Sequence, residues 1–293
     1  MTFRSGFVAV VGRPNTGKST LVNALVGQKV SIVTDKSQTT RSRVRGVRTT
    51  DRVQLVFTDT PGFHKPRTLL GQRLNRMVEE STEDVDAVVL VVDAAAGVGR
   101  GDAFVAKHRV ATLRCPKVCA VNKVDLVPGH DVLPQLEAAA GLSDFDHVFP
   151  VSALTGRGVD ELLDVLSDSM PEGPAYFPAG EVTDQPVQYR VAEIVREKAL
   201  TVTREEVPHS IAVQVEEMDR QDDLIRIACL ILVERESQRG IVIGRAGAML
   251  KRIGTLARKE IELLLGTRVF LGLRVKVQRE WQRDPGALSR LGY

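Results

Sequence analysis

The chain has 293 residues, of which 43% are apolar and 26% charged, so it can bury a sizeable core, and its length suggests two domains. The composition carries no signature of disorder, and no apolar run approaches the roughly 20 residues that a membrane-spanning helix requires. The net charge is only +3, but residues 239–283 hold 11 Lys and Arg against 3 Asp and Glu. That imbalance indicates a basic surface suited to a polyanionic partner, with a solvated helix face as the alternative.

Three cysteines, Cys115, Cys119 and Cys229, lie in apolar, strand-like contexts without the spacing of metal ligands. We interpret them as buried thiols, which indicates a reducing compartment. The N-terminal residues lack the long apolar region and the cleavage site of a signal peptide. A cytoplasmic protein is therefore expected.

The first 170 residues alternate strand-like and helix-like segments. Short, β-branched, nearly continuous apolar runs predict strands that are buried on both faces. Their order with the helices predicts an α/β fold with a mostly parallel sheet, helices on both faces and right-handed crossovers. A further strand at 42–50 is expected to pair antiparallel with 53–58. The predicted parallel strands are 7–11, 53–58, 87–92, 117–121 and 147–151, and the clearest helices are 19–26 and 159–166.

The segment GRPNTGKS at 12–19 fits the pattern GxxxxGK[ST] of a phosphate loop between a strand and a helix. Small residues let backbone N–H groups surround phosphates, and the helix N-terminus adds positive potential. Lys18 is expected to reach the outer phosphates and Ser19 to ligate Mg²⁺. The residues assigned to the nucleotide here are Gly12, Arg13, Pro14, Asn15, Thr16, Gly17, Lys18, Ser19 and Thr20.

The polar and basic segment DKSQTTRSR at 35–43 has no periodicity. Thr40, with Thr39 as the alternative, is a candidate to give a hydroxyl to Mg²⁺ and a backbone amide to the γ-phosphate. Loss of that phosphate would release the segment, which is how a nucleotide switch works. An ordinary surface loop is the other interpretation.

The tetrapeptide DTPG at 59–62 follows a strand, where open α/β sheets bind their ligands. Asp59 is expected to hold Mg²⁺ through water, and the amide of Gly62 to approach the γ-phosphate. Phe63 cannot orient a water by hydrogen bonding, which leaves His64 as a candidate, or as an exposed histidine without that role. The predicted catalytic residues are Lys18, Thr40, Asp59 and Gly62, and nucleotide contacts are also assigned to Thr60, Pro61 and Phe63.

The motif NKVD at 122–125 follows a predicted strand and indicates which base is bound. The carboxylate of Asp125 would accept hydrogen bonds from N1–H and the amine of guanine, whereas adenine has no donor at N1; such a site discriminates by about 10⁴. Asn122 and Lys123 would brace the base and the phosphate loop. The backbone of Ser152 and Ala153, in VSAL, would meet the base edge. GTP or GDP with Mg²⁺ is therefore the predicted ligand.

From Pro171 the sequence PEGPAYFPAGEVTDQP reads as a linker. The region after it is expected to form a helix (187–198), a strand (210–218), a polar turn (219–222), a strand (223–234), a short helix, a glycine loop, a long helix (248–265) and a strand (268–278). We predict a GTPase domain at 1–172, a linker at 173–186 and a smaller α+β domain at 187–293.

The glycine loop GRAG at 244–247 lies between an aliphatic run and the long predicted helix. The element order resembles a type II KH domain, whose GxxG loop clamps about four nucleotides of single-stranded RNA. The glycines let a phosphodiester pass close to the backbone, and Arg245 adds a charge. The apolar residues that would line either the bases or the core, with more of them in the core, are Ile241, Val242, Ile243, Ala248 and Leu250. The predicted RNA-binding residues are Ile243, Gly244, Arg245, Ala246, Gly247 and Lys251.

The ordered motifs GRPNTGKS, QTTR, DTPG, NKVD and VSA resemble those of translation-factor-type GTPases of the Era and TrmE group. With the glycine loop, REEVPHS at 204–210 and WQRDPGALSRLGY at 281–293, the resemblance to the Era family is nearly full length. That group has an apolar residue after DTPG, as Phe63 is here, which implies slow unaided hydrolysis. The resemblance also implies that a monovalent cation such as K⁺, held partly by Asn15, replaces an arginine finger.

The resemblance implies binding to the 3′ region of 16S ribosomal RNA and a role in maturation of the 30S ribosomal subunit, with nucleotide state controlling RNA access. It also implies peripheral contact with the inner membrane face, and we expect a monomer. The alternative is a GTP-switched adaptor whose C-terminal domain binds a protein or an anionic membrane surface. A TrmE-like enzyme is disfavoured because its C-terminal cysteine motif is absent, and a tandem GTPase is excluded by the single NKVD.

Overall fold

The computed structural model describes residues 2–36, 38–63, 66, 68–204, 207–221 and 223–293. Contacts divide the chain into two compact units. The first comprises Met1–Ser31, Thr40–Arg67 and Gly71–Asp184, and the second comprises Ile32–Thr39, Thr68–Leu70 and Gln185–Tyr293. By its contacts the segment 32–39 thus belongs to the second unit. The domain boundaries predicted at 172 and 187 stay a prediction. By their contacts, residues 173–184 of the predicted linker group with the first unit.

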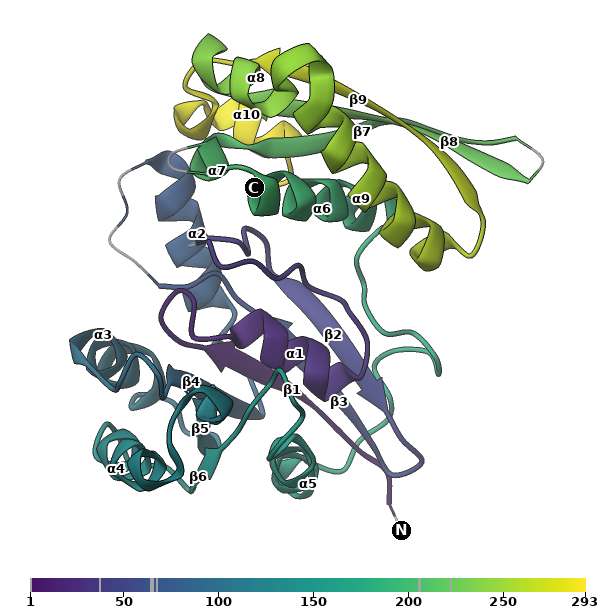
Figure 1. Cartoon of the computed structure of the whole chain (residues 1–293). Helices are drawn as coiled ribbons and strands as arrows, with labels where there is room; N and C mark the ends of the chain where they lie inside the picture. The colour runs from purple at the N-terminus through teal and green to yellow at the C-terminus, as the bar shows by residue number, and fades with distance from the viewer. Residues whose placement is uncertain (1, 37, 64–65, 67, 205–206, 222) are drawn as a thin grey trace. The chain divides into compact units, whose positions relative to one another are not determined.

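The first unit is built on a six-stranded sheet of order β2-β3-β1-β4-β5-β6 (Figure 1). Strand β2 is antiparallel to β3, and the other described pairs are parallel, so the predicted mostly parallel sheet with one added antiparallel strand is confirmed. The strands are β1 (Arg4–Val11), β2 (Val44–Thr49), β3 (Val53–Asp59), β4 (Ala87–Asp93), β5 (Lys117–Asn122) and β6 (His147–Pro150).

Helices cover both faces of this sheet. Alternate residues of β1 enter two apolar clusters, with Val8 and Val10 in one and Ala9 and Val11 in the other. The first cluster includes α1 (Lys18–Val26) and α5 (Val159–Ser169), and the second includes α2 (Leu69–Glu80), α3 (Arg100–Val105) and α4 (Gly129–Ala140). Burial on both faces explains why the strands are continuously apolar. The parallel strands therefore end at one edge of the sheet, where the predicted motifs follow them.

The linker residues lie along the edge of this sheet. Val47 of β2 donates its N–H to the carbonyl of Val182 at 2.9 Å, and Gly46 forms an antiparallel bridge with Thr183. On β3, the buried side chain of Gln54 accepts the N–H groups of Tyr176 and Phe177 at 2.7 and 2.9 Å. The linker is thus fixed to β2 and β3 by backbone and side-chain hydrogen bonds.

The second unit has a three-stranded sheet of order β7-β8-β9, with β7 and β8 antiparallel and β8 and β9 parallel (Figure 1). One apolar cluster joins Val195 of α6, Ile231 of β8 and Ile253 of α9. The predicted order of helix, two strands, two helices and strand is confirmed. The elements are α6 (Val187–Val202), α7 (Val207–Ser210), β7 (Ala212–Gln221), β8 (Leu224–Val233), α8 (Glu236–Ile243), α9 (Ala248–Leu265), β9 (Arg268–Val277) and α10 (Pro285–Arg290).

The prediction of a polar turn at 219–222 is wrong for residues 219–221. Strand β7 continues through Gln221, which pairs with Leu224, while Asp219 pairs with Arg226. Exposed ladder positions accept polar side chains, so composition alone does not mark where a hairpin turns. The predicted turn residue Asp222 lies outside the described residues.

The cysteine prediction holds for two of the three positions, since Cys119 and Cys229 are buried and Cys115 is half-buried, all as free thiols. Burial raises the pKa of both buried thiols to about 12. Within the described part of the chain, no helix is long and apolar enough to cross a membrane.

Candidate functional site

The phosphate loop connects the end of β1 to the start of α1 in the first unit. Lys18, the first residue of α1, is buried, and its Nζ donates to the carbonyl of Arg13 at 2.7 Å. Thr16 is also buried, and its hydroxyl donates to the same carbonyl at 3.1 Å. These two bonds hold the loop together at the carbonyl of Arg13. Among the described residues, no side chain caps the N-terminal amides of α1. Such amides form an anion site.

Three hydroxyl and carboxylate side chains from separate segments meet beside this loop. The Oγ of Ser19 lies 2.8 Å from the Oγ1 of Thr40, which donates to Oδ2 of Asp59 at 3.4 Å. Asp59 is fully buried at the end of β3. The set consists of the oxygen ligands that Mg²⁺ prefers.

The charged groups here lack full compensation within the protein. Burial lowers the pKa of Lys18 from 10.5 to about 8, although the charge of Asp59 opposes this effect. Burial likewise raises the pKa of Asp59, against the hydrogen bond from Ser19 and the charge of Lys18. Oδ1 of Asp59 is buried without a hydrogen-bond partner among the described residues. A water bound to a divalent cation would satisfy that oxygen, and a polyphosphate would stabilise the Lys18 ammonium, so the residues fit both groups.

The hydroxyls of the two candidate switch threonines point to different partners. The Oγ1 of Thr39 lies 2.6 Å from that of Thr34 and donates to the carbonyl of Lys36 at 2.7 Å. The hydroxyl of Thr40 instead joins the cluster of Ser19 and Asp59. The geometry favours Thr40 over Thr39 as a metal ligand.

The DTPG segment lies directly against the phosphate loop. A Cβ at Gly62 would be 2.6 Å from the Cα of Pro14, so this close approach requires glycine. Thr60 is buried and donates to the carbonyl of Val10 at 2.8 Å, which ties the segment to β1. The rings of Phe63 and Phe104 stack with their centroids 5.4 Å apart. His64, the other candidate for orienting water, lies outside the described residues.

The base-recognition segment is braced against the phosphate loop. Asn122 is buried and donates to the carbonyl of Thr16 at 2.9 Å, and Lys123 donates to the carbonyl of Asn15 at 2.7 Å. Asp125 follows in a short turn and is exposed, with its carboxylate open to a ligand.

The two predicted backbone donors after β6 already have partners inside the chain. The N–H of Ala153 donates to Oδ1 of Asn122 at 2.9 Å, and that of Ser152 donates to the carbonyl of Arg157 at 2.8 Å. To contact a base as well, each of these N–H groups would have to divide its hydrogen bond between the base and its present partner.

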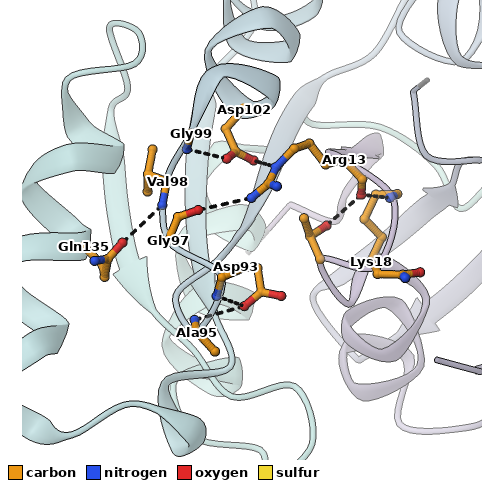
Figure 2. Close-up of polar contacts among 12 residues, drawn as sticks. Arg13, Lys18, Asp93, Ala95, Gly97, Val98, Gly99, Asp102 and Gln135 are labelled. Atoms are coloured by element: carbon orange, nitrogen blue, oxygen red, sulfur yellow. Dashed lines mark hydrogen bonds and ion pairs between the residues drawn. The ribbon is translucent and has the colours of Figure 1, made fainter. Parts of the chain in front are cut away.

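The side chain of Arg13 turns away from the phosphate loop (Figure 2). Its Nε donates to Oδ1 of Asp102 at 2.7 Å, and its Nη2 donates to the carbonyl of Gly97 at 3.2 Å. Asp102 is fully buried in α3 and accepts the N–H of Gly99, so it needs a cation nearby. The side chain of Arg13 therefore braces the loop, and only the backbone of Arg13 is available to the ligand. Sequence reasoning missed Asp102 because it lies 89 residues from Arg13 without a motif.

In the second unit the GRAG loop joins α8 to α9. Arg245 and Ala246 are exposed, and Gly247 precedes the first residue of the 18-residue helix α9 without a side-chain cap. The first turn of α9 holds no acidic residue, and Lys251 is exposed in the next turn. Two exposed loop residues, a helix N-terminus and the cations Arg245 and Lys251 thus lie at one loop, which suits a phosphodiester.

The apolar residues around this loop divide between core and surface. Val242 is buried, and Leu250 packs partly buried against the same core cluster. Ile241 is 48% exposed, and Ile243 is half-buried beside the loop. Only Val242 and Leu250 therefore serve the core, whereas Ile241 and Ala248 are exposed and Ile243 is half-buried. The prediction that more of these five residues lie in the core is wrong.

Two family models match the chain. The model described as 50S ribosome-binding GTPase matches residues 7–123, and the KH domain model matches residues 206–282. GTPase Era of Mycobacterium avium (strain 104) is 50% identical over 298 residues, covering 99% of both chains. GTPase Era of Mycobacterium tuberculosis (strain ATCC 25177 / H37Ra) is 50% identical over 297 residues with the same coverage. The chain belongs to the Era family of GTPases.

Solved Era structures agree over the full length. A crystal structure of Era in complex with MgGDPNP and nucleotides 1506–1542 of 16S ribosomal RNA gives a TM-score of 0.96 at 40% identity, covering 99% of both chains. A variant of Aquifex aeolicus Era bound to GDP and AlF₄⁻ gives the same values. The predictions of the Era family, of a GTPase enzyme, and of a P-loop domain followed by a KH domain are confirmed.

Proposed function

We propose that this protein is a GTP-driven switch that binds the 3′ region of 16S ribosomal RNA through its KH domain and acts in maturation of the 30S subunit. The main support is its likeness, at a TM-score of 0.96 over 99% of both chains, to Era carrying MgGDPNP and nucleotides 1506–1542 of that RNA. The exposed GRAG loop and the basic stretch 239–283 support the same role from the chain itself.

The nucleotide would be held by groups that lie together in the first unit. Lys18 and the α1 amides would bind the phosphates, and Ser19, Thr40 and Asp59 would hold Mg²⁺. The metal would neutralise charge that develops on the phosphates. The chain itself would orient the γ-phosphate through the backbone of Thr40 and Gly62. The other nucleotide contacts predicted from the sequence are part of this proposal. So is a K⁺ ion held partly by Asn15.

Binding of GTP should weaken as the pH rises through about 8. The pKa of Lys18 is about 8 in the protein chain, and a bound triphosphate favours the charged form, so binding takes up a proton above that pH. The affinity should then fall by up to about tenfold per pH unit. Phosphate groups have a second pKa of about 6 and no longer titrate in this range. Titration with a fluorescent GTP analogue between pH 7 and 9.5 measures the slope, and a flat profile would contradict the role of Lys18.

Binding of RNA should depend steeply on salt. Contact with about four phosphates of a single strand gives a slope near −3 in the logarithm of affinity against salt, or about 20-fold weaker binding for a threefold rise in salt. Filter binding of a 3′-terminal 16S fragment to the full chain checks this. An unlabelled single strand should compete far more strongly than vesicles of phosphatidylglycerol, because RNA is the main partner of the basic stretch. Competition by vesicles alone would favour the adaptor alternative instead.

The location and the assembly of the protein follow from the same proposal. We infer a cytoplasmic monomer, with any membrane contact peripheral and carried by the basic stretch 239–283. This stretch would then serve an anionic lipid surface and RNA by the same charge, with RNA as the main partner.

A further inference from the structure

The segment 32–39 belongs to the second unit, while Thr40 belongs to the first. One of the boundaries between the two units along the chain thus falls at the peptide bond between Thr39 and Thr40, inside DKSQTTR. One side of that bond carries Thr39, and the other carries Thr40, whose hydroxyl lies 2.8 Å from Ser19 in the nucleotide site.

Two neighbouring residues of α6 hold this segment near its two ends. Arg196 donates from Nη2 to the carbonyl oxygen of Thr39. The next residue, Glu197, accepts the N–H of Val33 on its Oε1 at 2.8 Å. Arg196 and Glu197 are 0% and 3% exposed, and both hydrogen bonds are partly buried. Both ends of the segment are therefore fixed to a single turn of one helix.

The ion pair that orients Arg196 is local to α6. Its Nε and Nη2 donate to the carboxylate of Glu193 at 2.7 and 2.6 Å. Its Nη1 is buried without a hydrogen-bond partner among the described residues. A buried guanidinium with an unsatisfied nitrogen contributes little to stability, because its desolvation offsets the attraction to Glu193. Stability alone thus gives no reason for an arginine at this position.

The geometry of the peptide bond connects Arg196 to the nucleotide site. The carbonyl of Thr39 and the N–H of Thr40 belong to one planar, trans peptide group, in which the two bonds point in opposite directions. A donor that fixes the carbonyl therefore also fixes the direction of the N–H. That N–H is the amide proposed to meet the γ-phosphate, and the hydroxyl of the same residue is the proposed metal ligand.

We propose that Arg196 is a positioning residue for GTP hydrolysis, which holds the Thr39–Thr40 peptide from α6 and so orients Thr40. This inference rests on the proposed nucleotide function.

A second contact joins α6 to the helix that follows the GRAG loop. Lys198 forms ion pairs with Glu197 at 2.5 Å and with Glu260 of α9. The carboxylate that receives Val33 is thereby tied to α9, the helix that begins at the proposed RNA loop. This contact connects the helix that follows the GRAG loop to the helix that holds the segment 32–39.

Two substitutions in the full chain test the role of Arg196. Arg196→Met keeps a similar volume without the donors, and Arg196→Lys keeps the charge beside Glu193 but has a single, shorter-reaching donor group. The variant R196M should lower kcat for GTP about 10- to 100-fold, because a small misplacement of a positioned group has effects of that size. The lysine variant should fall in between. The affinity for GDP, which has no γ-phosphate, should stay within about twofold for both.

The control is Thr201→Ala, an exposed position on the same helix whose hydroxyl donates to the backbone carbonyl of Glu197 one turn earlier. This variant should hydrolyse GTP at the rate of the unaltered protein. Retained binding of the 16S fragment would show that the second unit is folded in R196M, and R196K decides the matter if R196M fails to fold. Unchanged kcat in the folded variants, or an equal loss of GDP affinity, would overturn the role of Arg196. Failure of the unaltered protein to bind RNA would instead count against the proposed function.

Discussion

Asp125→Asn should lower the affinity for GTP by about 10³- to 10⁴-fold and raise the affinity for xanthosine triphosphate. Xanthine carries a carbonyl where guanine has its amine, so an asparagine amide can donate to it, whereas a carboxylate is repelled. The fold should tolerate the change, since Asp125 is exposed and the flanking loop is held by Asn122 and Lys123.

Competition of both nucleotides against a labelled GTP analogue measures the shift. Asp131→Asn provides a matched control, because Asp131 is an exposed aspartate in the first turn of the nearby α4. That variant should keep the original preference. If D125N retained its preference for GTP, the assignment of Asp125 to guanine would be wrong.

Gly247→Asp should reduce RNA binding by at least about 100-fold while GTP hydrolysis without RNA stays within about twofold of the original rate. The new carboxylate would compete for the amides at the start of α9 and repel a phosphodiester. Space is not the reason, because a Cβ at Gly247 would meet no heavy atom within 4 Å. Aspartate also caps helices well, so α9 itself is not weakened by losing a cap.

The backbone at this position needs its own control. Gly247 has a φ of +77°, which costs a non-glycine residue about 1–2 kcal/mol. Gly247→Ala carries the same backbone cost without the charge, and it should bind RNA far better than G247D in the same filter assay. An equal loss in both variants would assign the effect to the backbone. Parallel losses of RNA binding and hydrolysis in G247D would argue against separate sites.

The sequence predicts those parts of the molecule whose signals are contiguous. A phosphate loop such as 12–19 carries its glycines, lysine and serine in one stretch because one turn of backbone surrounds the phosphates. The strands of the first unit are recognisable because burial on both faces makes every position apolar. The KH element order follows from helix and strand periods in the same way.

Contacts between distant residues leave no such signal. Nothing near Arg13 indicates that its side chain meets Asp102, and nothing near Thr39 indicates Arg196, 157 residues away. An arginine in an amphipathic helix normally reads as exposed, so the burial of Arg196 was not predictable. The continuation of β7 beyond Met218 was not predicted for a related reason. Polar residues at exposed positions of paired strands resemble the residues of a turn.

The linker on β2 has a consequence for the solution behaviour of the first unit. Strand β2 is the outermost strand of the six-stranded sheet, and outermost strands present backbone groups that can recruit another chain. The bonds of Val47 to Val182 and the bridge of Gly46 to Thr183 occupy part of that border. The connector between the units thus also shields the molecule from self-association, and a fragment cut before Pro174 would lose that shield.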